Sequence, residues 1–437
     1  MDALGMDALH GKLSRRAMLA RSAAVVASGG LLPYFYSIGS KAAEATGDRL
    51  GVAAIGTGGR GAYVGHRAAR RGRIVACCDV DRRRAETFAA RYDGRCQVYG
   101  DYRRVLDRKD VDVLTVGTPD HWHAKIVIDA LRAGKDVYCE KPLTLTIDEG
   151  KQICRTVRET GRVVQVGTQQ RSEDDGVFLQ AVALARSGYL GKKLRAVVSV
   201  GSAPRGGPFA PAPTPSTLDW EFWLGQSPQV PYCPQRAHYD FRWWFEYAGG
   251  QVTYWGVHHV DIAMWALGLD ETGPVRIEAA GRLPDVSGGF NVPSTFRSTM
   301  SFAGGATIVL DSDKNALRIE GDSGAIVVDR RRLTGKPVEG LSQSQREWLE
   351  QETVRLFRGK QPGNHMQNFF ECVQDRSLPI SDVFTHHRAL SACHLCNIAM
   401  RLKRTLDWDP LRQDFVGDSE ASSLLSREQR KPYTINA

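Results

Sequence analysis

The sequence lacks the features that mark several classes of protein. No apolar run reaches the ~20 residues that a membrane-spanning helix needs. We find no internal repeat and no low-complexity tract, which argues against solenoid and fibrous architectures. Hydrophobic residues make up 42% and charged residues 24% of the 437 positions, values typical of a globular chain rather than a disordered one. At roughly 100–200 residues per domain, this length predicts two or three domains.

Cysteines are few and irregularly spaced. There are nine, an odd number without a regular pattern, which argues against a disulfide framework. Cys393 and Cys396 have a C-x-x-C spacing found in zinc sites, but no second pair follows and their surroundings have an amphipathic helical pattern. His386 and His387 are adjacent and therefore do not share a helix face. We interpret the two cysteines as buried core thiols and predict no metal site.

Basic residues exceed acidic residues by 58 to 49, which gives a formal net charge of +9. Local clusters stand at Arg82–Arg84 and Arg330–Arg332, each after an aspartate and without interleaved aromatic residues. A nucleic-acid surface usually combines such clusters with a recognition motif. We therefore interpret both clusters as solvated helix faces or turns and predict no nucleic-acid partner.

The first 45 residues carry an export pattern. Arg15 and Arg16 precede the weakly apolar stretch 17–32, and alanines recur between 42 and 45. This is typical of a twin-arginine signal peptide, whose pathway moves folded proteins that load a cofactor first. The alternative is a chance arginine pair before an alanine-rich helix. We exclude residues 1–45 from the fold and expect a periplasmic or otherwise exported protein, with no membrane insertion after processing.

Alternation of strands and helices between residues 50 and 168 predicts a parallel sheet. Short apolar runs rich in Val, Ile and Ala, typical of strands buried on both faces, alternate with segments of helical period. The expected strands are 50–57, 73–79, 111–118, 136–139 and 163–167, and the expected helices are 61–71, 82–92, 123–133 and 147–160. This pattern gives an α/β domain with a doubly wound, Rossmann-type sheet, which we place at residues 46–170.

After residue 170 the pattern changes to that of an α+β domain. The period-two alternation from 275 to 329, with glycine-containing turns, predicts antiparallel strands. The other expected elements are helices at 177–187, 366–373 and 389–402, a strand at 194–201 and a loop rich in Pro and Gly at 203–215. We place this second domain at residues 171–405 and a polar C-terminal tail at 406–437.

A glycine-rich turn predicts a dinucleotide site. It fits G-x-G-x-x-G between the first strand and the first helix, with the residues Gly56, Thr57, Gly58, Gly59, Arg60 and Gly61. Backbone N–H groups and the helix dipole at such a turn can bind a pyrophosphate. Asp79, at the end of the next strand, can accept both ribose hydroxyls and repels a 2′-phosphate. We predict NAD; NADP is less favoured but stays open, because Arg82 and Arg83 can bind that phosphate. The alternative is a glycine-rich turn that binds no ligand.

Two further motifs identify a family. Residues 118–123 read Thr-Pro-Asp-His-Trp-His, and Glu-Lys-Pro at 140–142 follows the strand at 136–139. With the glycine turn, these motifs resemble the glucose–fructose oxidoreductase / inositol dehydrogenase family (Gfo/Idh/MocA). The segments 241–244 and 365–369 look closest to its twin-arginine-exported branch. The resemblance covers the chain from about residue 50 to the tail. It implies a large, mostly antiparallel open sheet in the second domain and a homodimer or homotetramer.

The resemblance also implies roles for individual residues. It places Lys141 beside the nicotinamide and the substrate hydroxyl, where an ammonium orients the hydroxyl and stabilises alkoxide character. His258 matches the catalytic histidine, whose near-neutral pKa suits proton transfer. Tyr254 stands where many members have Asp, and a phenol is not a carboxylate at neutral pH. The other implied cofactor contacts are Thr118, His121, His123, Glu140, Lys141 itself and Gln169.

Five residues are weaker candidates for binding the substrate. They are Arg171, His238, Arg242, Trp243 and Asp261. Flat aromatic rings cover the C–H faces of sugars, and polar groups bind their hydroxyls. Asp261 follows His258 by three positions and shares its helix face, so it either orients the imidazole or caps or pairs locally. We interpret His259 as structural and the aromatic residues Trp220, Phe222 and Trp223 as core.

These observations favour an NAD-dependent oxidoreductase that acts on a hydroxyl of a sugar, cyclitol or glycoside. Lys141 would polarise the hydroxyl, His258 would take its proton, and a tightly bound cofactor would be recycled in situ. The first alternative is an NAD-dependent glycoside hydrolase or lyase that works through transient oxidation at C3 and elimination, as some relatives do; the Asp-to-Tyr change at Tyr254 favours it. The second is a non-catalytic protein that binds NAD or a sugar. The expected partner is a carbohydrate or polyol.

Overall fold

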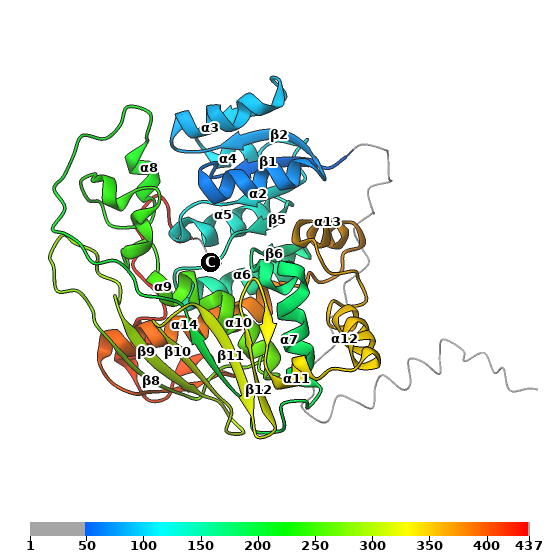
Figure 1. The fold of residues 1–437 in the computed structure, drawn as a ribbon. Helices are drawn as coiled ribbons and strands as arrows, with labels where there is room; N and C mark the ends of the chain where they lie inside the picture. The colour runs from blue at the N-terminus through cyan, green and yellow to red at the C-terminus, as the bar shows by residue number, and fades with distance from the viewer. Residues whose placement is uncertain (1–48, 436–437) are drawn as a thin grey trace, which may run out of the picture. The chain divides into compact units, whose positions relative to one another are not determined.

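A computed structural model describes residues 49–435 (Figure 1). The predicted twin-arginine signal at residues 1–45 lies outside the described residues, and export stays a prediction. Within residues 49–435, no helix combines the length and the apolar character that crossing a membrane requires.

The N-terminal part of the described chain is a parallel sheet, as predicted, with six strands where the sequence pattern indicated five. Its strand order is β3-β2-β1-β4-β5-β6. The strands are β1 (Gly51–Ile55), β2 (Arg73–Cys78), β3 (Gln97–Tyr99), β4 (Val113–Val116), β5 (Asp136–Cys139) and β6 (Val164–Val166). The direction of winding reverses between β1 and β4, so the carboxyl ends of these strands border a crevice, the usual ligand position in such sheets.

Local side-chain chemistry fixes the helices that connect these strands. They are α2 (Gly59–Ala69), α3 (Arg82–Ala89), the 3₁₀ turn η1 (Ala90–Tyr92), α4 (Tyr102–Leu106), α5 (Asp120–Arg132) and α6 (Ile147–Thr160). A capping box between Thr146 and Glu149 begins α6, and Gly161 at φ +63° ends it. Helix α5 begins three residues earlier than predicted, directly after Pro119, whose ring presets a helix start.

The second part of the chain forms a nine-stranded sheet with the order β13-β12-β11-β7-β10-β9-β8-β14-β15. Its strands are β7 (Arg195–Ser199), β8 (Arg276–Gly281), β9 (Phe296–Ser301), β10 (Thr307–Asp311), β11 (Ala316–Gly321), β12 (Gly324–Val328), β13 (Leu333–Thr334), β14 (Leu406–Asp409) and β15 (Asp414–Phe415). Neighbouring strands are antiparallel except β7 and β10, which are parallel. The predicted polar tail thus adds two strands to the sheet, with Trp408 and Phe415 buried.

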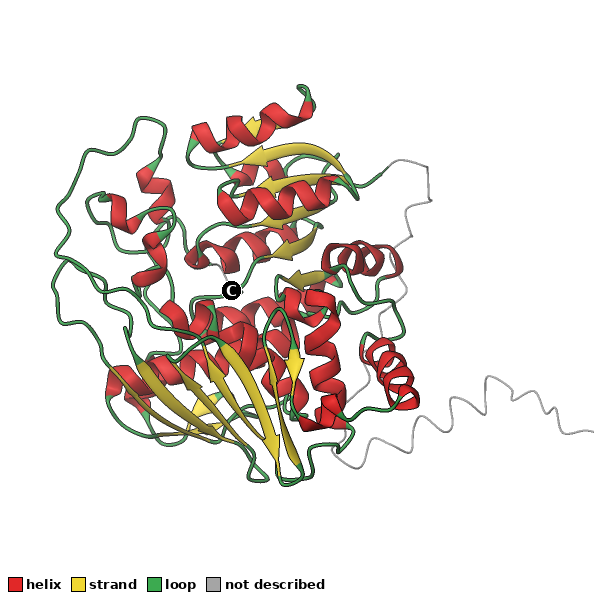
Figure 2. Cartoon of the chain, in the orientation of Figure 1, coloured by secondary structure: helices red, strands yellow, loops and turns green. Residues whose placement is uncertain are grey.

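Helices cover the face of this sheet that is turned toward the Rossmann domain (Figures 1 and 2). They include α7 (Val177–Arg186), α10 (Gly256–Ala266) and α14 (Val383–Leu402). The remaining helices are α8 (Trp220–Leu224), α9 (Gly250–Tyr254), α11 (Lys336–Glu339), α12 (Gln343–Leu356), α13 (His365–Asp375) and α15 (Ser419–Ser423). Short 3₁₀ turns are η2 (Gln169–Arg171), η3 (Asp174–Gly176), η4 (Pro234–Arg236) and η5 (Asp240–Trp243).

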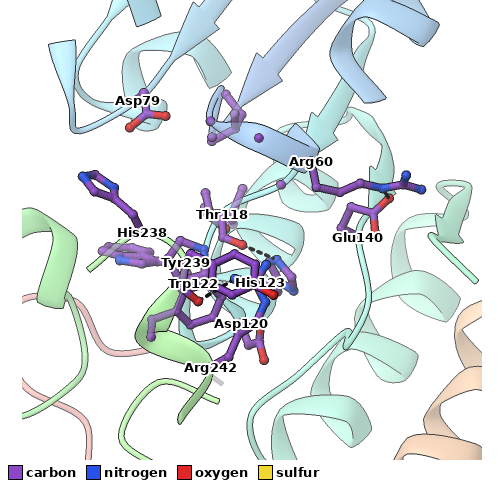
Figure 3. Close-up of a pocket in the computed structure, with 18 of the residues that line it drawn as sticks. Arg60, Asp79, Thr118, Asp120, Trp122, His123, Glu140, His238, Tyr239 and Arg242 are labelled. Atoms are coloured by element: carbon purple, nitrogen blue, oxygen red, sulfur yellow. Dashed lines mark hydrogen bonds and ion pairs between the residues drawn. The ribbon is translucent and has the colours of Figure 1, made fainter. Parts of the chain in front are cut away.

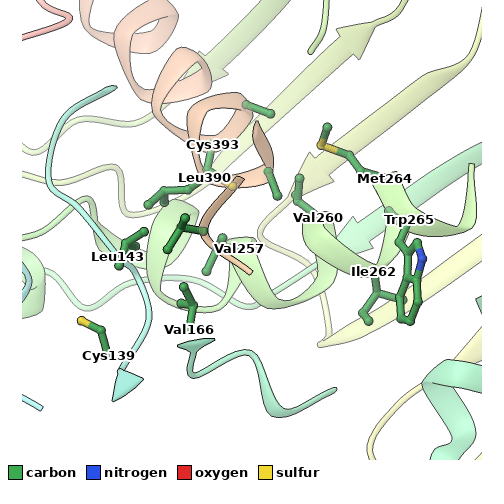
Figure 4. Packing of buried hydrophobic residues seen from close by; sticks show 14 of the residues in the cluster. Cys139, Leu143, Val166, Val257, Val260, Ile262, Met264, Trp265, Leu390 and Cys393 are labelled. Carbon is green, nitrogen blue, oxygen red and sulfur yellow. The ribbon is translucent and has the colours of Figure 1, made fainter. Parts of the chain in front are cut away.

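One hydrophobic core joins the two domains. Cys139 at the end of β5 and Val166 at the end of β6 belong to the same buried cluster as Val257 on α10 and Leu390 on α14 (Figure 4). Every residue of α10 is buried. Close packing of this kind tolerates little displacement. The loop after β5 and the start of α10, which carry Lys141 and His258, are therefore held in a fixed relation.

Candidate active site

A cavity of about 500 Å³ lies between the carboxyl ends of the Rossmann strands and the second domain. The first domain contributes most of the glycine turn, Asp79, the segment 117–123 except His121, and the Glu140–Lys141 pair. The second domain contributes α8, the η5 region, Tyr254, Trp255, His258 and Arg330. Figure 3 shows side chains from both domains pointing into this space. One cavity thus brings together most of the residues that the motifs single out.

The glycine turn has the geometry of an anion site. Gly56 has φ +77°, a left-handed conformation that favours glycine. A Cβ on Gly61 would lie 1.9 Å from Gly56 O, so only glycine allows α2 to approach β1 this closely. No side chain caps the N-terminus of α2, and its first turn carries no acidic residue. Its N–H groups are therefore available to a phosphate. These residues fit a dinucleotide.

Asp79 sits at the nucleotide end of the cavity with both oxygens oriented by the backbone. Its Oδ2 accepts from the Thr57 N–H at 2.8 Å and its Oδ1 from the Asp81 N–H at 2.9 Å. Burial raises the pKa of the Asp79 carboxyl, and these two hydrogen bonds oppose the rise. Arg84 lines the cavity beside it, whereas Arg82 and Arg83, singled out from the sequence, do not. The donor set fits ribose hydroxyls.

Lys141 lines the cavity. Its Nζ donates to Tyr254 O at 2.6 Å and lies 3.9 Å from the centroid of the Tyr254 ring. Burial lowers the pKa of Lys141 to about 7; Glu140 and Asp120 raise it, and Arg242 lowers it further. A lysine with this pKa is present both as an amine and as an ammonium at neutral pH, which suits proton exchange.

The loop that carries Lys141 is held by hydrogen bonds on both sides. Glu140 accepts from Arg60 Nε at 3.0 Å and from Gln169 Nε2 at 2.9 Å. The ring nitrogens of His123 lie 2.7 Å from Pro142 O and 2.9 Å from Thr118 O. All of these residues except Pro142 line the cavity, and the groups named here are bonded within the protein, whereas the Thr118 hydroxyl has no partner among the described residues. Their visible role is to position Lys141.

His258 lies in the cavity wall with its Nδ1 buried and without a hydrogen-bond partner among residues 49–435. Burial lowers its pKa well below 6.5, and the positive charges of Lys141 and Arg330 lower it further. The near-neutral pKa expected from the sequence is therefore wrong, first because the imidazole is buried and second because cations surround it. Burial raises the pKa of the Tyr254 phenol, and Arg242 opposes this. Both side chains are neutral hydrogen-bonding groups at pH 7.

Two family models match the chain. The model described as oxidoreductase family, NAD-binding Rossmann fold, matches residues 50–168, and the model described as oxidoreductase family, C-terminal alpha/beta domain, matches residues 206–435. The chain belongs to the Gfo/Idh/MocA oxidoreductase family. The family prediction made from the motifs is confirmed, and membership of the exported branch stays a prediction.

Individual relatives match this chain over part of their length. Inositol 2-dehydrogenase of Salmonella typhimurium is 32% identical over 122 residues, 28% of this chain and 36% of its own. The 2,7-anhydro-N-acetylneuraminate hydratase of Mediterraneibacter gnavus is 34% identical over 120 residues, 27% of this chain and 31% of its own. The chain thus spans about a third of the length of these curated relatives.

Solved structures show that the fold extends over most of this chain. The WlbA dehydrogenase from Chromobacterium violaceum, in complex with NADH and UDP-GlcNAcA, superposes with a TM-score of 0.62 at 16% identity. The match covers 83% of this chain and 97% of that structure. At this identity the likeness shows the fold.

Six residues expected at the site do not line the cavity: Thr57 and Gly61 of the glycine turn, and His121, Arg171, Trp243 and Asp261. Arg171 and Asp261 form an internal ion pair with N–O distances of 2.6 and 2.8 Å, 2% and 1% exposed. A buried charge requires such a partner, so Asp261 pairs with Arg171 instead of orienting His258. His121 Nε2 lies 2.9 Å from Trp223 O, and Trp243 is buried in an aromatic cluster. The cavity instead contains the other two substrate-binding candidates, His238 and Arg242.

Several cavity residues were missed by the sequence analysis. Asp120 is buried beside Lys141 and Arg242, and burial raises its pKa to about 7. Arg330 was interpreted as part of a solvated turn, yet it lines the cavity with its side chain 42% exposed. Phe222 and Trp223 are buried, as expected of core residues, and also border the cavity. The motif at 118–123 contained the signal for Asp120; nothing local distinguished Arg330.

Proposed function

We propose that this chain is an NAD-dependent oxidoreductase that oxidises a hydroxyl of a sugar, cyclitol or glycoside. The observation that carries the proposal is Lys141: a buried amine with a pKa of about 7, in the same cavity as an uncapped glycine turn and a neutral histidine. The relatives named inositol 2-dehydrogenase support a polyol or sugar as the substrate.

The residues of this chain supply binding and proton transfer. The turn 56–61 and the first turn of α2 would hold the pyrophosphate of NAD, and Asp79 would hold a ribose. When bound, NAD supplies the hydride acceptor. The neutral amine of Lys141 accepts the proton of the substrate hydroxyl. His258 has a pKa too low for an effective base, so we assign it a hydrogen bond to that hydroxyl rather than the proton transfer expected from the sequence.

We further propose that the protein works outside the cytoplasm with the cofactor retained through the catalytic cycle. The twin-arginine pattern supports export. Free NAD is not dependably available outside the cytoplasm, so an exported enzyme has to keep its cofactor bound. The direct test is to denature the purified protein and analyse the supernatant for dinucleotide. The protein is then mixed with a panel of glycosides and polyols while the absorbance of bound nicotinamide is followed. Rapid loss of dinucleotide on dialysis contradicts retention, and no absorbance change with any compound contradicts the oxidoreductase.

Replacing Asp79 by serine is expected to change cofactor preference. The carboxylate is oriented by two backbone N–H groups and repels a 2′-phosphate, whereas the neighbouring Arg84 attracts one. The ratio of NADPH affinity to NADH affinity should rise roughly tenfold, equal to ~1.4 kcal/mol. Fluorescence titration with both nucleotides measures it. Asp93→Ser, an equal loss of charge at an exposed position, serves as the control, and an unchanged ratio contradicts the role of Asp79.

The rate of oxidation is expected to rise as the pH passes through about 7, the pKa of Lys141. Below this pH the ammonium cannot accept a proton, and above it the amine can. The negative charge of Asp120 raises this pKa, so Asp120→Asn should lower it and move the rising limb of kcat/KM to lower pH by roughly one unit. Asp93→Asn should leave the profile in place. A limb that stays near 7 in Asp120→Asn argues against the coupling of these two groups.

A second candidate function is an NAD-dependent glycoside hydrolase or lyase. It is favoured by Asp120, a buried carboxyl whose pKa of about 7 lets it exchange protons beside Lys141. Elimination and addition of water require such an acid–base group beyond the one that serves oxidation. A relative named as a hydratase supports this reading. Release of aglycone from an aryl glycoside without added NAD supports the second function, and net reduction of NAD supports the first.

A further inference from the structure

Two guanidinium groups of the second domain lie in the cavity without a close anionic partner. Arg242 Nη1 donates to Tyr239 O at 2.7 Å, and its Nε is buried without a hydrogen-bond partner among the described residues. Arg330 follows β12, and its only ion pair within residues 49–435 is a long one, 3.8 Å from its Nε to Asp174 Oδ2. Both groups keep N–H donors available to a ligand.

Aromatic rings lie close to both guanidinium groups. Arg242 Cζ lies 4.7 Å from the centroid of the Tyr254 ring, and Arg330 Cζ lies 4.7 Å from that of Trp255. A cation–π contact of this kind uses none of the N–H donors of the guanidinium in a hydrogen bond, and these donors match a planar carboxylate. Lys141 Nζ lies 3.9 and 5.9 Å from the centroids of the same two rings. Each arginine thus contacts an aromatic ring that also lies near Lys141, the proposed proton acceptor.

The acidic residues of the cavity leave this positive charge unbalanced. Glu140 is paired with Arg60, and Asp79 lies at the nucleotide end with its oxygens on backbone N–H groups. Asp120 is the remaining acidic side chain of the lining, and the nearby positive charges that act on it are those of Arg242 and Lys141. An excess of cationic groups in a partly enclosed site raises the local concentration of anions.

We propose that Arg242 and Arg330 bind the carboxylate of an acidic sugar, a hexuronate or its glycoside, and that the cavity selects such sugars over neutral ones. This inference rests on the proposed oxidoreductase function, because the same sugar presents its reacting hydroxyl to Lys141. In the reaction the substrate carbon loses a hydride to NAD and its hydroxyl loses a proton to Lys141. The carboxylate is unchanged and serves only to hold the sugar.

Binding to the full protein loaded with NADH tests the proposal without requiring turnover. Isothermal titration compares D-glucuronate with D-glucose and D-galacturonate with D-galactose. We expect at least one uronate to bind roughly tenfold more tightly than its neutral counterpart. Arg330→Gln and Arg242→Gln should each reduce that affinity roughly tenfold while leaving NADH affinity unchanged. Arg331→Gln removes the same charge from an exposed neighbour outside the cavity and should change nothing.

The possible outcomes distinguish a failure of the proposed carboxylate site from a failure of the proposed oxidoreductase function. If neither uronate binds more tightly than its neutral counterpart, the inference is overturned, even where a neutral sugar is oxidised. Loss of NADH affinity in the two variants would assign the arginines to the cofactor phosphates instead. Much tighter binding of D-glucose 6-phosphate would show that the two arginines bind a phosphate monoester rather than a carboxylate. If a uronate binds and both variants lose this binding, the inference is supported. If the bound uronate nevertheless fails to reduce bound NAD, only the proposed oxidoreductase function is contradicted.

Discussion

Replacing Lys141 by methionine is expected to lower kcat/KM for the oxidised substrate by about three orders of magnitude. Methionine keeps most of the length and the apolar stem of the side chain but removes the amine that exchanges the proton. Positioned acid–base groups contribute ~10²–10⁴-fold to such reactions. Because the pKa of Lys141 is about 7, the variant should also lose the rise in rate near that pH. Steady-state kinetics across pH measures both effects.

Cofactor binding shows whether this loss is chemical or structural. The glycine turn and Asp79 lie on other loops, so NADH affinity in Lys141→Met should stay within about threefold of the original. Lys109→Met, at an exposed position away from the cavity, provides a control for the same substitution. A variant that retains turnover would remove Lys141 from the mechanism, and one that loses NADH would show that it mainly holds the nucleotide.

Elements with complete local signals were predicted well from the sequence. The predicted bounds of α6 and β5 coincide with those of the structure, because a capping box and a glycine bound the helix and a run of buried residues defines the strand. Strand β3 was missed, since it has three residues, two of them exposed, and shows no periodicity. The polar composition of the tail concealed β14, whose buried residues alternate with exposed ones over only four positions.

The same holds for the candidate site. Residues within sequence motifs could be predicted, whereas residues that reach the cavity only through tertiary contacts could not. Lys141 and His258 share a cavity, as the family pattern implies, although their roles stay predictions. Arg330 reaches the cavity from a turn far away in the sequence, and no local pattern reports such a contact. Asp261 was misplaced because spacing on a helix identifies a shared face but not the partner across it. Arg171 was misplaced because its resemblance to a family position beside the pocket does not report its buried ion pair.

The buried ion pair between Arg171 and Asp261 leads to the second prediction with a large expected effect. Replacing Arg171 by methionine is expected to destabilise the fold by about 3–5 kcal/mol, because it leaves Asp261, 1% exposed, without its partner. Arg171 also lies over the Trp265 ring and donates to Ile380 O, so its loss weakens the packing of η2 on α10. Unfolding in urea, followed by intrinsic fluorescence, measures the shift. Arg103→Met breaks an exposed pair, 54% exposed on the arginine side, and should cost less than ~1 kcal/mol.

A double variant distinguishes an internal role of this pair from the substrate-binding role expected from the sequence. Arg171→Met combined with Asp261→Leu removes both charges, so no buried ion is left unpaired and most of the lost stability should return. Since neither side chain lines the cavity, the double variant should keep the KM of the original protein. A stable Arg171→Met with a strongly raised KM would reverse this assignment and place the guanidinium on the substrate. A double variant as unstable as the single one would instead show that Asp261 has a further buried partner.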